Sequence, residues 1–306
     1  MKLSKRDLLI VTVILVVLST LPLYASGYPI SLLTIILMYA TMSVSWMIFS
    51  AYTGYISLAA VAFFGIGAYI SVLFWTTLPL PVIIVLSALA SAAFALIIGF
   101  PFLRIRGPYF IIATLGLSEL VRYIFENYQT YVLHRVGIPL LDTPSVEVLY
   151  YALLVVCVIT VIVAHIIKNS KFGFGLLSIR GNEEGAKVMG VDTTRYKLLA
   201  FAISGAFMGC VGAITALRWT WVEPFMVFNP MISFKVIIMA LLGGIGNFRG
   251  PIIGAIILIL VEEAFGITYP TYYMILLGVI IVVLIKFLPT GILGGIGKLR
   301  FLKKGR

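Results

Sequence analysis

Long apolar runs, separated by short charged connections, are the feature that most restricts the fold of this chain. Many of the runs approach the roughly 20 residues that a helix needs to cross the hydrocarbon core of a bilayer. Hydrophobic residues make up 62% of the 306 positions and charged residues only 11%, whereas soluble domains carry about 25% charged residues. Because backbone groups inside a bilayer must be paired internally, we expect an all-α polytopic transmembrane bundle that forms a single domain over residues 1–306.

The apolar runs predict ten spans, within a range of eight to ten. They lie near residues 8–25, 30–50, 55–76, 80–100, 108–127, 148–168, 198–217, 232–247, 251–266 and 270–288. The eighth and ninth runs are short and rich in glycine, so they could form a tight helical hairpin or a re-entrant pair buried in protein. The first run resembles a signal peptide, but the rest of the chain is also membrane-like, so we expect an uncleaved first helix.

Basic residues gather in alternate connections of this arrangement. With the N-terminus in the cytoplasm, the cytoplasmic connections hold most of the lysines and arginines; they are 51–54, 101–107, 169–197, 248–250 and 289–306. This positive-inside pattern places both termini in the cytoplasm. It also explains the net charge of +11 through topology and contact with anionic membrane lipid, rather than through nucleic-acid binding.

Several function classes lack the residues that they require. Cys157 and Cys210 lie within apolar runs, and His134 and His165 are isolated, so we expect neither a disulfide framework nor a metal site. No glycine-rich run ends in Lys-Ser or Lys-Thr, so a P-loop is absent and ATP with magnesium would be bound by partner chains. The spans offer no nucleophile–base pair, and we therefore expect neither an enzyme nor a bound cofactor.

The connection 169–197 is far longer than the two to eight residues that a simple turn between helices requires. Asn182 can cap a helix, and Glu183 and Glu184 then lie in its first turn, where acidic side chains suit the helix dipole. Gly190 can end this helix in a left-handed conformation. We expect one helix of about two turns on the cytoplasmic side, either as a dock for a partner or as an ordinary amphipathic loop.

Polar residues also occur within the apolar runs. Glu119 and Arg122 are three apart, so they share a helix face and can pair. Charges at such depth usually face a bundle interior or an aqueous path, although a pair near the outer interface could also snorkel. Small residues around Gly54 and Ser57 permit close packing of helices or an interrupted helix that lines a path.

Three of these segments together resemble the LivM-type permeases of branched-chain amino acid ABC importers. They read LRIRGPYFIIATLGLSELVR, SKFGFGLLSIRGNEEGAKVMGVDTTRYKLLAF and LLGGIGNFRGPIIGA, in this order. The resemblance covers most of the chain, from about Gly54 to the last span. It implies a transport subunit, not an enzyme, that lies as a multi-pass protein in the inner (plasma) membrane of a prokaryotic cell.

The resemblance also implies partners and site residues. The partners are a second related permease, two cytoplasmic ATPases and an extracytoplasmic substrate-binding protein. Segment 169–197 would contain the coupling helix that docks on an ATPase, with Arg180, Asn182, Glu183, Glu184, Ala186, Lys187 and Gly190 as candidate contacts. The candidate residues of the translocation path are Gly54, Ser57, Phe63, Tyr69, Thr114, Glu119 and Arg122.

The cargo that the resemblance implies is an amino acid, most of all a branched-chain one. Two segments depart from the family: run 54–60 lacks its usual Gln and His, and loop 134–145 lacks its Gly-Gly-Ser/Thr-Asp-Gly run. A permease for urea or short amides in the same family is therefore an alternative. A stand-alone ion-coupled carrier is a second alternative, and only the Glu119–Arg122 pair supports it.

Overall fold

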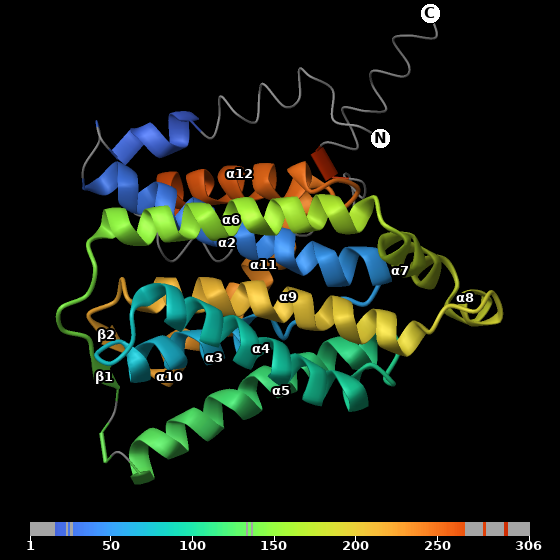
Figure 1. Cartoon of the computed structure of the whole chain (residues 1–306), viewed down its shortest axis with the longest axis horizontal. Coiled ribbons are helices and arrows are strands. Elements are labelled where there is room, and N and C mark those ends of the chain that lie inside the picture. Colours follow the sequence, from blue (N-terminus) through green and yellow to red (C-terminus); the bar gives the residue numbers. More distant parts are fainter. Residues whose placement is uncertain are drawn as a thin grey trace, which may run out of the picture.

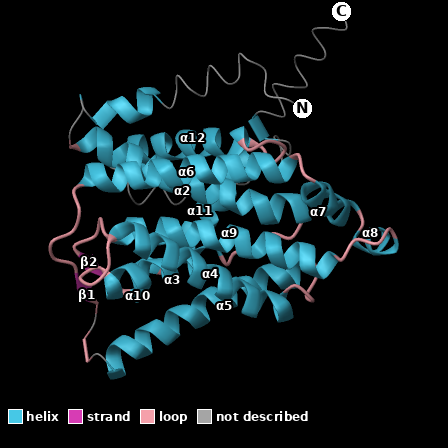
Figure 2. Cartoon of the chain, viewed as in Figure 1, coloured by secondary structure: helices cyan, strands magenta, loops and turns pink. Residues whose placement is uncertain are grey.

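The computed structural model describes residues 16–22, 24, 27–132, 134–135, 137–266, 278–279 and 291–292. The described part is mostly α-helical, and its strands form one short antiparallel pair (Figure 2). The elements are α2 (Tyr28–Trp46), the π-helix η1 (Met47–Ala51), α3 (Ala60–Phe74), α4 (Leu80–Phe102), α5 (Pro108–Asn127), the π-helix η2 (Tyr128–Val132), β1 (Ile138–Pro139), α6 (Val146–Lys168), α7 (Lys171–Gly181), α8 (Glu183–Val188), α9 (Thr193–Ala216), β2 (Trp221–Val222), α10 (Pro224–Val227), α11 (Pro230–Gly243) and α12 (Arg249–Gly266). The predicted helical bundle is confirmed.

Six helical stretches of the described residues are long and apolar enough to cross a membrane: Tyr28–Ala51, Leu80–Phe102, Pro108–Val132, Val146–Lys168, Thr193–Ala216 and Pro224–Gly243. The prediction of one continuous helix over 55–76 is wrong, because α3 covers only Ala60–Phe74 and the residues before it are not helical. The last predicted span and most of the first lie outside the described residues. Helices α11 and α12 pack directly on one another, as expected for a hairpin.

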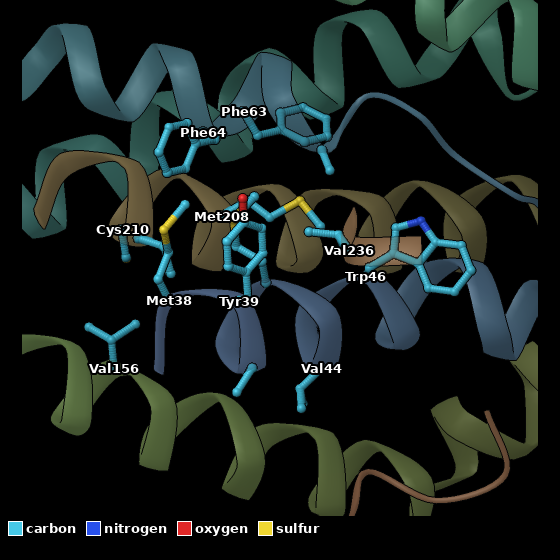
Figure 3. Packing of buried hydrophobic residues seen from close by; sticks show 14 of the residues in the cluster. Met38, Tyr39, Val44, Trp46, Phe63, Phe64, Val156, Met208, Cys210 and Val236 are labelled. Carbon is cyan, nitrogen blue, oxygen red and sulfur yellow. The ribbon is translucent and has the colours of Figure 1, made fainter. Parts of the chain in front are cut away.

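Helices α2 and α9 form the interior of the bundle and are the most enclosed of the candidate spans. Side chains of α2 fill the space between α6 on one side and α9 and α11 on the other, and α3 lies beyond α9 (Figure 3). Met38 and Trp46 of α2 pack in one cluster with Phe63 of α3 and Met208 of α9. Burial on every face explains why α2 shows almost no polar stripe.

Helices α3 and α9 approach each other so closely that only glycine fits between them. A Cβ atom at Gly67 would collide with the carbonyl oxygen of Gly209. Small residues at such positions let helix backbones touch inside a membrane, where close packing replaces the hydrophobic driving force.

We expect Gly67→Ala to lower the stability of the purified protein by about 1–3 kcal/mol, because overpacking forces the two backbones apart. Gly116→Ala is the matched control, since nothing lies within 4 Å of a Cβ atom at that position of α5. The control should be neutral or slightly stabilising through higher helix propensity. Melting temperatures in detergent check this, and equal values for the two variants would contradict the close approach.

The two ends of the bundle differ in character (Figure 1). One end carries α7 and α8, and the opposite end carries α10 and the strand pair β1–β2.

Four of the connections predicted to be cytoplasmic meet at the α7–α8 end. Arg106 pairs with Glu184 at 2.6 Å, Arg180 Nη1 donates to the carbonyl of Ala51 at 2.9 Å, and Lys168 Nζ donates to that of Gly246 at 3.1 Å. Connection 289–306 and the basic N-terminus fall outside the described residues, apart from residues 291–292.

Candidate functional site

Segment 169–197 folds into two short helices, so the expectation of one two-turn helix is incomplete. The additional helix is α7, which begins after Ser170 because the hydroxyl of that residue accepts a hydrogen bond from Gly173 N at 3.1 Å. Serine is a favoured N-cap, and Ser170 was the signal in the sequence that could have revealed this helix.

The predicted caps of α8 are confirmed. Asn182 Oδ1 accepts a hydrogen bond from Gly185 N at 3.0 Å, which caps the first turn. At the other end Gly190 has a φ of 84°, and its N–H donates to the carbonyl of Lys187 at 2.9 Å. Because only glycine adopts this conformation readily, the chain turns sharply here and α8 protrudes from the bundle (Figure 1).

The inner side of α8 is tied to the bundle through Glu183. One carboxylate oxygen accepts a hydrogen bond from the Tyr55 hydroxyl at 2.6 Å, and the other accepts one from Lys197 Nζ at 2.9 Å. Lys197 Nζ also donates to the carbonyl of Leu103 at 3.1 Å, and its side chain is only 4% exposed. Counting charges places Lys197 among the cytoplasmic residues, but the structure buries it as the hub of this junction.

The two acidic side chains of α8 face different surroundings. Burial alone would raise the pKa of Glu183, but the hydrogen bonds from Tyr55 and Lys197 outweigh it and lower the pKa below its ordinary value. The pKa of Glu184 is lowered by the hydrogen bond from Arg106 in an exposed ion pair. Both carboxylates are therefore ionised at neutral pH.

The candidate coupling residues thus divide into two groups. Glu183 and Ala186 face the bundle, and Arg180 packs against Gly54 while its guanidinium donates to Ala51. The exposed members are Asn182, Glu184, Lys187 and Gly190, and Arg180 is also exposed although it contacts the bundle. The residues next to them that sequence reasoning missed are Val188 and Met189, whose exposed fractions are 86% and 85%.

This part of the chain is the interrupted helix that the small residues suggested, because Gly54–Ala59 forms a non-helical break between η1 and α3. Its two ends bond to backbone of the flanking helices, whereas the N–H groups of Ser57, Leu58 and Ala59 donate to side-chain hydroxyls. Ser57 makes three bonds that join a backbone group to a side chain. Its carbonyl accepts a hydrogen bond from Trp46 Nε1 at 2.8 Å, and its N–H donates to Ser50 Oγ at 3.3 Å. The Ser57 hydroxyl accepts a hydrogen bond from Ala59 N at 3.2 Å. Irregular backbone at membrane depth is tolerated only where such partners exist.

Hydroxyl groups from two other helices complete this pairing. Leu58 N donates to Thr114 Oγ1 of α5 at 3.0 Å, and the Leu58 carbonyl accepts from Ser118 Oγ at 3.2 Å and Ser233 Oγ at 2.9 Å. Ser233 Oγ of α11 also accepts from Val61 N at 3.0 Å. The structure therefore brings Ser57 and Thr114 of the predicted path together, and adds Ser118 and Ser233, which the sequence did not single out.

The remaining candidate path residues lie elsewhere. Glu119 and Arg122 form the predicted ion pair, with 2.7 Å between Oε2 and Nη2. The guanidinium carbon of Arg122 also lies 5.5 Å from the ring centroid of Phe225. Tyr69 packs between aromatic rings, and its hydroxyl has no hydrogen-bond partner among the described residues. Phe63 is buried in the core, where its ring centroid lies 5.1 Å from that of Phe201.

The bundle of long apolar helices is typical of a multi-pass membrane protein. A family model described as branched-chain amino acid transport system, permease component, matches residues 28–285. The chain therefore belongs to the family of branched-chain amino acid transport permeases. It is a transport subunit of a bacterial ABC system and not itself an enzyme, and permease subunits of this family bind no cofactor.

Individual relatives agree with this family. The high-affinity branched-chain amino acid transport system permease proteins LivM of Salmonella typhimurium and Escherichia coli are 28% and 27% identical to this chain, over 94% of it and 75% of each relative. The LivH permease protein of Escherichia coli is 29% identical over 42% of this chain and 41% of its own length. No solved structure matches the chain.

Proposed function

We propose that this chain forms one half of the translocation path of an ATP-driven importer for branched-chain amino acids. A second, related permease would complete the path, two cytoplasmic ATPases would supply energy, and an extracytoplasmic binding protein would deliver the cargo. The similarity to LivM over 94% of the chain supports the cargo and the presence of partners.

The protruding helix α8 carries this proposal. It lies at the end of the bundle where the basic connections meet, which is the cytoplasmic end by the positive-inside pattern. Its tip presents Val188 and Met189 almost fully exposed, directly after the charged residue Lys187, which pairs with Glu184. Apolar side chains grouped outside the membrane mark an interaction surface, and we assign this one to an ATPase. The ATP-bound and ADP-bound states would hold α8 differently, and that difference would shift the permease between its two conformations.

The outward faces of α4 and α5 differ in composition. In the candidate spans of α4 and α5 the same share of residues, 28%, is buried within the chain. The outward side of α4 is apolar, which suits lipid; its exposed large side chains are Val82, Val85, Leu86, Leu89, Leu96, Ile97 and Phe100. The span of α5 is the least apolar of the six, and its outward residues include Glu126 and several tyrosines. We therefore place α5, with Glu119 and Arg122, beside the path and the second permease, because charges in a membrane face a protein interior or water.

Reconstitution tests the proposed function. The chain would be purified with the second permease and the ATPases of its own system, placed in liposomes and supplied with the binding protein. We expect uptake of labelled leucine, isoleucine or valine that requires ATP and stops with a hydrolysis-deficient ATPase. Uptake of urea or short amides instead would favour the alternative cargo. Gradient-driven uptake by the chain alone would favour an ion-coupled carrier.

The Glu119–Arg122 pair gives a further prediction. Arg122→Met should lower stability by about 2 kcal/mol or more, since hydrogen bonds to charged groups are worth about 1.5–3 kcal/mol and Glu119 would lose its partner. The double variant Glu119→Gln/Arg122→Met should recover part of this loss, because no unpaired charge remains. Arg195→Met is the control, because its pair with Asp192 is exposed and such pairs are worth about 0–1 kcal/mol. Melting temperatures check it, and equal losses in the single and double variants would contradict the pairing.

A further inference from the structure

The buried ammonium of Lys197 joins three parts of the chain that are distant in sequence. It donates to Glu183 Oε1 of α8 at 2.9 Å, to the Tyr55 hydroxyl at 3.1 Å and to the Leu103 carbonyl, after α4, at 3.1 Å. It also lies 4.4 Å from the centroid of the Tyr55 ring. An ammonium group has three donors, so these three bonds use its full capacity.

The hydrogen bonds close into a ring. The Tyr55 hydroxyl accepts from Lys197 and donates to Glu183 Oε2 at 2.6 Å, while Lys197 donates to the other oxygen of the same carboxylate. Charge-assisted bonds of this kind are strong and fix the geometry of the groups that they join. Because Lys197 is buried, water does not compete for these bonds, and the three side chains are held as one unit.

This unit connects α8 to the interrupted helix. Tyr55 belongs to the Gly54–Ala59 segment, two residues before Ser57, whose backbone groups bond to Trp46 and Ser50. A second contact supports the same connection, because Arg180 donates to the carbonyl of Ala51 at 2.9 Å and packs on Gly54. The chain entering the interrupted helix is therefore bonded to residues at the start of α8 and just before it.

We propose that the Lys197–Glu183–Tyr55 junction transmits the displacement of α8 to the interrupted helix at 54–59. This inference rests on the proposed function of the chain as an importer permease. Lys197 and Glu183 are positioning residues that act through Tyr55, and Glu183 is an internal link rather than a surface contact for the ATPase. The exposed face of α8 and this junction then have separate roles, binding and transmission.

Transport per ATP hydrolysed distinguishes transmission from binding. The reconstituted complex would be compared with Tyr55→Phe, which removes only the bridging hydroxyl, and with Glu183→Gln and Lys197→Met. We expect the ATPases to stay bound and to hydrolyse ATP, while cargo moved per ATP falls about tenfold or more, within the 5–150-fold range of typical couplings between sites. Lys197→Arg should restore part of the ratio, because it keeps a cationic donor at the position.

The matched control is Arg195→Met, which breaks the exposed pair with Asp192 in the same helix as Lys197 and should leave the ratio unchanged. Melting temperatures identify variants that fail to fold, and Tyr55→Phe keeps the test valid if Lys197→Met is one of them. A folded Tyr55→Phe complex with the wild-type ratio would overturn the inference. Absence of ATP-dependent uptake by the wild-type complex would instead overturn the proposed function.

Discussion

Replacing Val188 and Met189 together by aspartate is expected to weaken binding of the ATPase by about 30-fold or more, the effect of losing an interface hot spot. The two side chains are 86% and 85% exposed at the tip of α8, so the change removes apolar contact area without disturbing the bundle. The dissociation constant would be measured in detergent with the purified permease and ATPase. Melting temperatures of the permease alone should stay unchanged.

Leu141→Asp is the matched control for this experiment. Leu141 is also an exposed apolar residue, at 76%, but it lies near β1 at the opposite end of the bundle. It should leave ATPase binding intact. If the tip variant bound as tightly as wild type, the ATPase would dock elsewhere, and the exposed Phe174 of α7 would be the next residue to test.

The second large effect concerns the hydroxyl of Ser233. Ser233→Ala should lower stability by about 1–3 kcal/mol, because a buried polar group left unsatisfied costs about this much and the change leaves Val61 N in that state. Val61 N would lose the hydroxyl to which it donates, and the Leu58 carbonyl would keep only Ser118. Transport should fall with stability, since the interrupted helix loses its connection to α11.

Ser91→Ala is the matched control for Ser233→Ala. Ser91 is equally buried, but its hydroxyl donates to the Phe63 carbonyl inside α3, which the helix already pairs. Its loss should therefore cost less than about 1 kcal/mol, the worth of an ordinary hydrogen bond. Thermal or denaturant unfolding of both variants measures the difference. Equal costs would show that Ser233 does not hold the interrupted helix.

Local signals in the sequence were sufficient for features that depend on neighbouring residues. Asn182 and Gly190 bound α8 as expected, because capping and left-handed termination are decided within one turn. Glu119 and Arg122 pair as expected, since residues three apart share a helix face. The gathering of four basic connections at one end also followed from the order of the spans alone.

Features that depend on distant residues could not be predicted in the same way. Ser233 lies 172 residues from Val61, and the spacing along the chain gives no sign that they meet. Lys197 reads as one more cytoplasmic cation, and only the packing of α8 against Tyr55 and Leu103 buries it. The hydrophobic run 55–76 suggested a full span, but its first residues are not helical. Apolar content does not reveal that serine and threonine side chains elsewhere in the chain will pair the backbone groups of these residues.

Helix α9 has a consequence for communication across the membrane. It starts at Thr193, directly after its N-cap Asp192 and close to α8, and continues for 24 residues to Ala216, so it covers about 36 Å. Beyond its far end the Leu140 N–H donates to the Thr220 carbonyl at 3.0 Å, which fastens the chain after β1 to the segment that follows the same helix. A continuous α-helix of this length moves as one body. Under the topology and the partners proposed above, a shift imposed on the α8 end would therefore reach the opposite end of the bundle, and the face receiving the cargo would report the nucleotide state inside the cell.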